Sequence, residues 1–163
     1  MKNLVTVIIT TYNRLHFLKN ALTSVLNQSY QNIEIIIVDS SNNAQTQDFI
    51  TENKNLIYIY SDINHPNVLR NLGIQCANGN YIAFLDDDDT WESSKIERQI
   101  NYFNKYDIGL CYTGKNVVSE NNIKYSFKNG IFKSTKQSIL WDNFIGITSS
   151  IMIKKEVITN IGD

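Results

Sequence analysis

The sequence alternates short apolar runs with segments of helical periodicity, and this alternation limits the fold more than any other feature. Apolar runs of strand length recur at intervals of about 25 residues, at residues 4–9, 33–38, 56–60 and 81–85. The segments between them repeat apolar side chains at the spacing of one helical face, for example Leu18, Leu22, Val25 and Leu26. The pattern predicts βαβ units, a mostly parallel sheet and an α/β fold.

Further elements are expected on either side of the fourth run. Pro66 suits the first turn of a helix whose packed face holds Leu69, Leu72, Gly73 and Cys76. Residues 95–106 form a second predicted helix, and residues 108–112 and 150–153 form predicted strands. The alternating segments around Asn121 and Asn122 predict a hairpin. Trp141 and Phe144 fall in a mixed segment.

Composition excludes several classes of protein. The length of 163 residues fits one domain, and a net charge of −1 gives no electrostatic case for a nucleic-acid partner. No apolar run approaches the roughly 20 residues of a membrane span, and no secretory leader precedes the first strand. We therefore expect a cytoplasmic location, with a peripheral membrane association left open. Cys76 and Cys111 are expected to be buried, reduced thiols.

Four consecutive carboxylates, Asp86 to Asp89, follow directly behind the fourth apolar run. A helix cap would explain one or two of them, but not four. Because like charges repel, a fold that keeps them together has to supply a counter-charge, and a divalent cation is the simplest candidate. Hard oxygen ligands favour Mg²⁺, Mn²⁺ or Ca²⁺. The carboxyl ends of the strands are also where open α/β sheets bind ligands.

Three functional hypotheses compete for this acid run. An EF-hand-like calcium loop would use Asp86, Asp88, Thr90 and Glu97, but its glycine position is Trp91 and a strand precedes it. A haloacid-dehalogenase-like phosphatase would use Asp86 as nucleophile and Asp88 as acid/base, although three strands come first here. The third is a metal bridge to a diphosphate, with Asp86 and Asp88 on one side of an extended segment. The rest of the chain favours the third.

Several segments in register resemble the start of family 2 glycosyltransferases with the GT-A fold. They are residues 5–14, 21–30, 34–39, 70–82 and 84–91. The resemblance implies a three-layer α/β/α sandwich with a more irregular C-terminal part. It also implies transfer of a sugar, with inversion, from a nucleotide-diphosphate sugar to a carbohydrate or lipid-linked glycan acceptor in polysaccharide biosynthesis.

The same resemblance implies roles for particular residues. Thr10 and Tyr12 would line the base and ribose pocket, Asp39 would lie beside the nucleoside, Arg70 would contact the nucleotide or its phosphates, and Asp87 would face the ribose. Asp86 and Asp88 would hold Mn²⁺ or Mg²⁺. The family often has a second aspartate after the one at Asp39, where this chain has Ser40, so a preference for uridine is not implied.

Residues 149–162 resemble the stretch shortly before the family's acceptor-side acidic motif, which supplies the general base. We therefore expect the general base to lie beyond Asp163. Residues 1–112 are expected to form the nucleotide-binding βα units of a single domain, and residues 113–163 the start of its acceptor-side region. A nucleotide-sugar-binding fragment without turnover is the alternative.

Overall fold

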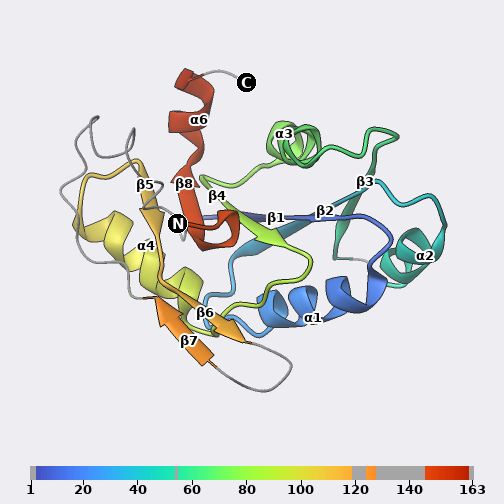
Figure 1. Ribbon diagram of the computed structural model, residues 1–163. Coiled ribbons are helices and arrows are strands. Elements are labelled where there is room, and N and C mark those ends of the chain that lie inside the picture. Colours follow the sequence, from blue (N-terminus) through green and yellow to red (C-terminus); the bar gives the residue numbers. More distant parts are fainter. Residues whose placement is uncertain (1–2, 54, 119–123, 128–145, 162–163) are drawn as a thin grey trace.

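The computed structural model describes residues 3–53, 55–118, 124–127 and 146–161. Six strands form the main sheet: β1 (Val5–Thr11), β2 (Ile33–Asp39), β3 (Ile57–Tyr60), β4 (Tyr81–Asp86), β5 (Leu110–Tyr112) and β8 (Ile151–Lys154). Helices α1 (Leu15–Leu26), α2 (Gln45–Thr51), α3 (Pro66–Cys76), α4 (Lys95–Lys105) and α6 (Lys155–Ile161) cover its two faces (Figure 1). This α/β architecture, including Pro66 in the first turn of α3, confirms the sequence prediction.

The sheet has the order β3-β2-β1-β4-β8-β5. Strands β1 to β4 pair in parallel, while β8 runs antiparallel to both β4 and β5. The register of the central pair places Thr10 opposite Asp86. The carboxyl end of β1 therefore meets the start of the acid run at one edge of the sheet.

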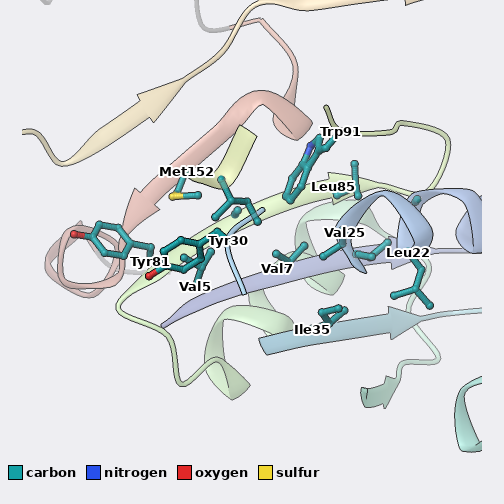
Figure 2. Close-up of a cluster of buried hydrophobic side chains, with 14 of the residues drawn as sticks. Val5, Val7, Leu22, Val25, Tyr30, Ile35, Tyr81, Leu85, Trp91 and Met152 are labelled. Carbon is teal, nitrogen blue, oxygen red and sulfur yellow. The ribbon is translucent and has the colours of Figure 1, made fainter. Parts of the chain in front are cut away.

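Alternation along β1 divides the core between the two faces of the sheet. Val5, Val7 and Ile9 belong to the larger cluster, which also contains buried side chains of α1, α2 and α4 (Figure 2). Ile8 points the other way and packs with Leu69 of α3. Burial on both faces explains why the central strands are continuous apolar runs.

Two side chains expected in packed positions are exposed. Leu26 has 60% of its surface exposed, and Cys76 is also exposed. Each is the last residue of its helix, α1 and α3 respectively, so helical spacing alone overestimated their burial. Cys111, in β5, is of intermediate exposure rather than fully buried.

The expected hairpin is present as β6 (Lys115–Val118) paired with β7 (Lys124–Phe127). The predicted strand at 150–153 is β8, preceded by a 3-10 turn, η1 (Thr148–Ser150). The mixed segment with Trp141 and Phe144 lies outside the described residues. Across the part of the chain that the structure describes, no helix combines the length and the apolar character needed to cross a membrane.

Candidate functional site

A cavity of about 370 Å³ opens where the carboxyl ends of β1 and β4 lie side by side. Its walls come from the end of β1, the segment leading into α3, and the acid run after β4. Among the residues that line it are Thr10, Tyr12, Arg70, Asp86, Asp87 and Asp88. These side chains, distant in sequence, thus surround one cavity at the sheet edge where α/β proteins bind ligands.

A larger cavity, of about 590 Å³, lies at the opposite ends of the same strands. Its lining includes Asn78, Asn80 and Lys155. None of the residues singled out from the sequence faces it. Volume alone therefore does not select the site, whereas the convergence of charged side chains does.

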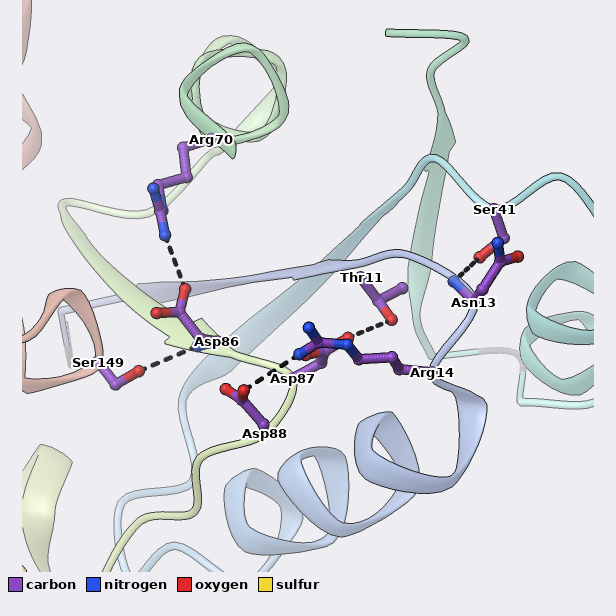
Figure 3. Close-up of polar contacts among 9 residues, drawn as sticks. All are labelled: Thr11, Asn13, Arg14, Ser41, Arg70, Asp86, Asp87, Asp88 and Ser149. Atoms are coloured by element: carbon purple, nitrogen blue, oxygen red, sulfur yellow. Dashed lines mark hydrogen bonds and ion pairs between the residues drawn. The ribbon is translucent and has the colours of Figure 1, made fainter. Parts of the chain in front are cut away.

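The acid run forms a turn. Strand β4 ends at Asp86, and the backbone N–H of Asp89 donates to the Asp86 carbonyl at 3.1 Å. The expectation that Asp86 and Asp88 lie on one side of an extended segment is therefore wrong. The Asp86 side chain points towards Arg70 of α3, whereas the Asp88 carboxylate contacts the side chain of Arg14 (Figure 3).

Two arginines pair with carboxylates of this turn. Arg70 donates from Nη2 to Asp86 Oδ1 at 2.7 Å. Arg14 donates from Nη1 to Asp88 Oδ2 at 3.1 Å and to Asp87 Oδ1 at 3.3 Å. The Nε atom of Arg70 is buried and has no hydrogen-bond partner among the described residues. Arg70 also lines the cavity, so its guanidinium charge is suited to bind a further anionic group there.

The four aspartates differ in their surroundings. Asp87 is buried, and its Oδ2 accepts a 2.7 Å hydrogen bond from the Thr11 hydroxyl. Burial raises the pKa of Asp87, while the Thr11 hydrogen bond and the charge of Arg14 oppose that rise. Burial also raises the pKa of Asp89, against a hydrogen bond from Ser149. Asp88 is instead half exposed, with 54% of its side-chain surface accessible.

Asp39 lies at the end of β2 and is fully buried. Its Oδ1 accepts hydrogen bonds from the backbone N–H, at 2.8 Å, and the hydroxyl of Ser41. Its Oδ2 accepts one from the Tyr58 hydroxyl at 3.0 Å. Burial and this contact raise the pKa of Tyr58. Asp39 is therefore placed beneath the loop that follows β2 and does not line the cavity, unlike the other predicted residues.

Asn13 sets the course of the loop between β1 and α1. Its φ of 54° lies in the left-handed region, which asparagine tolerates better than most residues. Its backbone N–H donates to Ser41 Oγ at 2.7 Å, and its Oδ1 accepts from Asn43 Nδ2 at 2.8 Å. These bonds tie the loop to the segment after β2. Arg14 then starts α1 with its side chain directed at the acid run (Figure 3).

The sequence analysis did not assign site roles to Thr11, Arg14 and Asn64, which also line the cavity. The position of Arg14 could have indicated a role in the site. A cation directly before a predicted helix is disfavoured by the helix dipole, so a different interaction is needed to explain it. Asn64 carried none. Its Oδ1 accepts from Ser40 Oγ at 3.2 Å, a contact between two polar loops that spacing does not reveal.

The donor groups fit a hard divalent cation shared with a bound phosphate. In residues 3–53, 55–118, 124–127 and 146–161, no three His, Cys, Asp or Glu side chains gather as a complete metal-binding group. Mg²⁺, however, is commonly bound through one or two carboxylates, with substrate phosphates and water as the remaining ligands. Asp86 and Asp88 supply such oxygens, and the guanidinium group of Arg70, which pairs with Asp86, also lines the cavity.

Comparison with known proteins agrees with this geometry. The sequence model for "Glycosyl transferase family 2" matches residues 6–162. The chain belongs to this family.

Among curated relatives, the chain is 37% identical over 113 residues to a protein of Escherichia coli, "UDP-Glc:alpha-D-GlcNAc-diphosphoundecaprenol beta-1,3-glucosyltransferase WfaP", covering 68% of this chain and 45% of that protein. The chain spans about a fifth to three fifths of the length of the curated relatives it matches.

Two solved structures share the fold. S. aureus TarS 1–349 in complex with UDP-GlcNAc superimposes with a TM-score of 0.76 at 19% identity, covering 97% of this chain and 47% of TarS. The mannosyltransferase PcManGT from Pyrobaculum calidifontis, in complex with GDP-Man and Mn²⁺, gives a TM-score of 0.72 at 15% identity, covering 99% and 47%. At these identities the likeness establishes the GT-A type of α/β fold.

Proposed function

We propose that this chain is the donor-binding part of an inverting glycosyltransferase, which transfers a sugar from a nucleotide-diphosphate sugar to an acceptor hydroxyl. The observation that carries the proposal is the convergence of Arg70 and Asp86 to Asp88 with Thr10 and Tyr12 on one cavity at the carboxyl ends of β1 and β4. Glycan biosynthesis is the proposed context, with a carbohydrate or lipid-linked glycan as acceptor.

The names of similar proteins support both a nucleotide-sugar donor and a lipid-linked acceptor. WfaP is named for a UDP-glucose donor and a diphosphoundecaprenol-linked acceptor, and TarS was crystallised with UDP-GlcNAc. PcManGT was crystallised with GDP-Man. Because these donors differ in their base, they support a nucleotide-sugar donor in general and no single nucleotide. Membership of family 2 of the glycosyltransferases argues against the phosphatase alternative.

The chain's own residues can bind and orient the donor. In the proposal, Thr10 and Tyr12 hold the base and ribose, and Asp87, anchored by Thr11, faces the ribose. Arg70, which lines the cavity, offers its guanidinium charge to a phosphate oxygen. Asp39 does not contact the donor in this proposal. It accepts a hydrogen bond from the Ser41 hydroxyl, and Ser41 in turn accepts one from the backbone of Asn13, which positions the loop that carries Tyr12.

Asp86 and Asp88 are the proposed ligands of Mn²⁺ or Mg²⁺. When bound there, such a cation would neutralise the negative charge that develops on the nucleoside-diphosphate leaving group. Both carboxylates contact guanidinium groups, so cation binding requires at least one of these contacts to rearrange.

The proposed division of the domain places donor binding in residues 1–112 and the start of the acceptor side in residues 113–163. The general base, which takes the proton of the acceptor hydroxyl, is proposed to lie beyond Asp163. The second hypothesis, a binding module without turnover, makes a different prediction: stable donor binding with no release of free sugar.

Calorimetric titration with UDP, GDP and dTDP, each with and without Mn²⁺, tests the donor site. We expect at least one nucleotide to bind with Mn²⁺ and to lose about tenfold or more in affinity without it. Asp88→Ala should remove this metal dependence. Asp107→Ala is the matched control, because Asp107 is fully exposed and pairs with Lys154 away from the cavity.

Binding of none of the three nucleotides by the wild-type chain would refute the donor site. Unchanged metal dependence in Asp88→Ala would refute the metal assignment alone. Incubation with a nucleotide sugar that binds then separates the two functional hypotheses: slow release of free sugar indicates an enzyme, whereas an intact donor after prolonged incubation indicates a binding module.

A further inference from the structure

Arg14 makes the contact that holds the most exposed carboxylate of the acid run. One atom, Nη1, donates to Asp88 Oδ2 at 3.1 Å and to Asp87 Oδ1 at 3.3 Å (Figure 3). Asp87 has a second anchor in the Thr11 hydroxyl, whereas Arg14 is the partner of Asp88 among the described residues. Loss of the Arg14 contact would therefore free Asp88 and leave Asp87 in place.

The position of Arg14 in the fold is locally unfavourable. It precedes Leu15 at the N-terminus of α1, where the positive end of the helix dipole disfavours a cation. Within the described part of the chain, no side-chain hydrogen bond caps that helix end. Half of the Arg14 side-chain surface is exposed, so little packing holds it there. A residue that breaks a local rule without structural benefit indicates a functional constraint, and here the acid run is what it contacts.

The charges of the cavity explain what Arg14 can do. Three carboxylates (Asp86, Asp87 and Asp88) face two guanidinium groups (Arg14 and Arg70), which leaves one negative charge in excess when all are ionised. Addition of a divalent cation changes that excess to one positive charge, which suits a diphosphate. The Arg14 charge therefore opposes cation binding but favours the anion that follows.

We propose that Arg14 is the counter-ion of Asp88. It pairs with this carboxylate before a divalent cation binds, and it releases the carboxylate to that cation. It then contributes its charge to binding of the donor diphosphate. The first part concerns the cation alone, and the second rests on the proposed function. Arg14 acts through Asp88 in the first part and is thus a positioning residue for the metal ligand. Because Arg14 already lines the cavity, its release needs only a side-chain rotation.

Titration of the chain with Mn²⁺ alone, followed by electron paramagnetic resonance of the free ion, tests the first part. We expect Arg14→Gln to bind Mn²⁺ about three- to tenfold more tightly than the wild type, because a competing charge is removed. Arg14→Lys keeps the charge and should lie within about twofold of the wild type. If Arg14 served only packing or helix geometry, the lysine variant would behave like the glutamine variant.

Lys19→Gln is the matched control, since it removes one positive charge from the same helix, where Lys19 lies over the Phe49 ring. An equal gain in this control would assign the effect to net charge and overturn the proposal. An Arg14→Gln affinity for Mn²⁺ equal to or weaker than that of the wild type would also overturn it. So would the absence of Mn²⁺ binding at millimolar concentration in both proteins. Circular dichroism at the titration temperature verifies that each variant is folded.

The second part predicts an effect of opposite sign. At saturating Mn²⁺, Arg14→Gln should bind UDP or GDP about three- to tenfold more weakly than the wild type. Unchanged nucleotide affinity would overturn the role in diphosphate binding. If the wild type binds neither nucleotide, the proposed function fails, while the Mn²⁺ titration still decides whether Arg14 competes for Asp88.

Discussion

Arg70 donates a 2.7 Å hydrogen bond from Nη2 to Oδ1 of Asp86, joining α3 to the end of β4 across the candidate site. The two side chains retain 20% and 33% of their accessible surface. Ion pairs that water can still reach contribute about 1 kcal/mol or less to folding. The contact therefore adds little to the stability of the fold, and its place in the cavity agrees with the proposed binding of a donor there.

Because the ion pair adds little to folding, Arg70→Gln should weaken nucleotide binding and leave the free energy of unfolding nearly unchanged. We expect the variant to bind nucleoside diphosphate about tenfold more weakly, because the guanidinium charge that lines the cavity is lost. The free energy of unfolding in urea should change by less than about 1 kcal/mol. Arg98→Gln, on the exposed face of α4, is the control and should change neither quantity. An equal loss of affinity in Arg98→Gln would contradict the assignment.

Thr11→Val should destabilise the chain through Asp87. The variant is close in shape to the wild type but removes the hydroxyl that donates to the buried carboxylate at 2.7 Å. Because a buried charged group then lacks one of its partners, we expect a loss of about 1–3 kcal/mol in the free energy of unfolding. Thr11→Ser keeps the hydroxyl and should recover most of that loss. Equal stability of the two variants in urea denaturation would show that the hydrogen bond is unimportant.

Two glycines beside the central strand should differ in their tolerance of alanine. At Gly73 an added Cβ would lie 2.6 Å from Ile8 Cγ2, a side-chain atom that can move, and alanine also favours the helix α3. At Gly79 it would lie 2.6 Å from the backbone nitrogen of Thr6 in β1, which cannot move without disturbing the sheet.

We therefore expect Gly79→Ala to cost about 3 kcal/mol and Gly73→Ala about 1 kcal/mol. Chemical denaturation of the two variants beside the wild type measures both. A larger cost at Gly73 would contradict the argument.

The sequence could predict the elements that are buried on both faces. The runs at β1 and β2 are continuous because helices cover each side of the sheet, and the acid run follows β4 where the strand loses its apolar character. Periodicity could not predict where a helix leaves the sheet, so Leu26 and Cys76 were assigned to packed faces although both end their helices in solvent.

The sequence could indicate which residues gather at the candidate site, but not which of them contact one another. Arg14 and Asp88 are 74 residues apart, and their contact depends on the parallel register of β1 and β4 and on the left-handed turn at Asn13. The burial of Asp39 likewise depends on Tyr58 from the neighbouring strand. The counter-charge was assigned to a cation from the acid run alone, since spacing within one segment does not show which distant arginines face it.

Lys95 should make the stability of the chain rise with pH just above neutrality. It is only 7% exposed, its ammonium donates to Gln99 Oε1 at 2.8 Å, and burial lowers its pKa to about 7. In the unfolded chain the pKa returns to about 10.4. Between these values the unfolded state binds more protons than the folded state, so the free energy of unfolding increases with pH.

If Lys95 lost its proton only in the folded chain, the free energy of unfolding would rise by about 2 kcal/mol between pH 7.0 and 8.5. The Trp91 ring, whose centroid lies 3.9 Å from the Lys95 ammonium, favours the charged form, so we expect about 1 kcal/mol. The quantity to measure is the difference in unfolding free energy between the wild type and Lys95→Met, which cancels groups common to both. The window ends at pH 8.5 because Cys111, which interacts with Lys95, ionises in the unfolded chain near that pH and then no longer cancels between the two proteins. A difference that stays constant from pH 7.0 to 8.5 would show that Lys95 remains charged in its buried position.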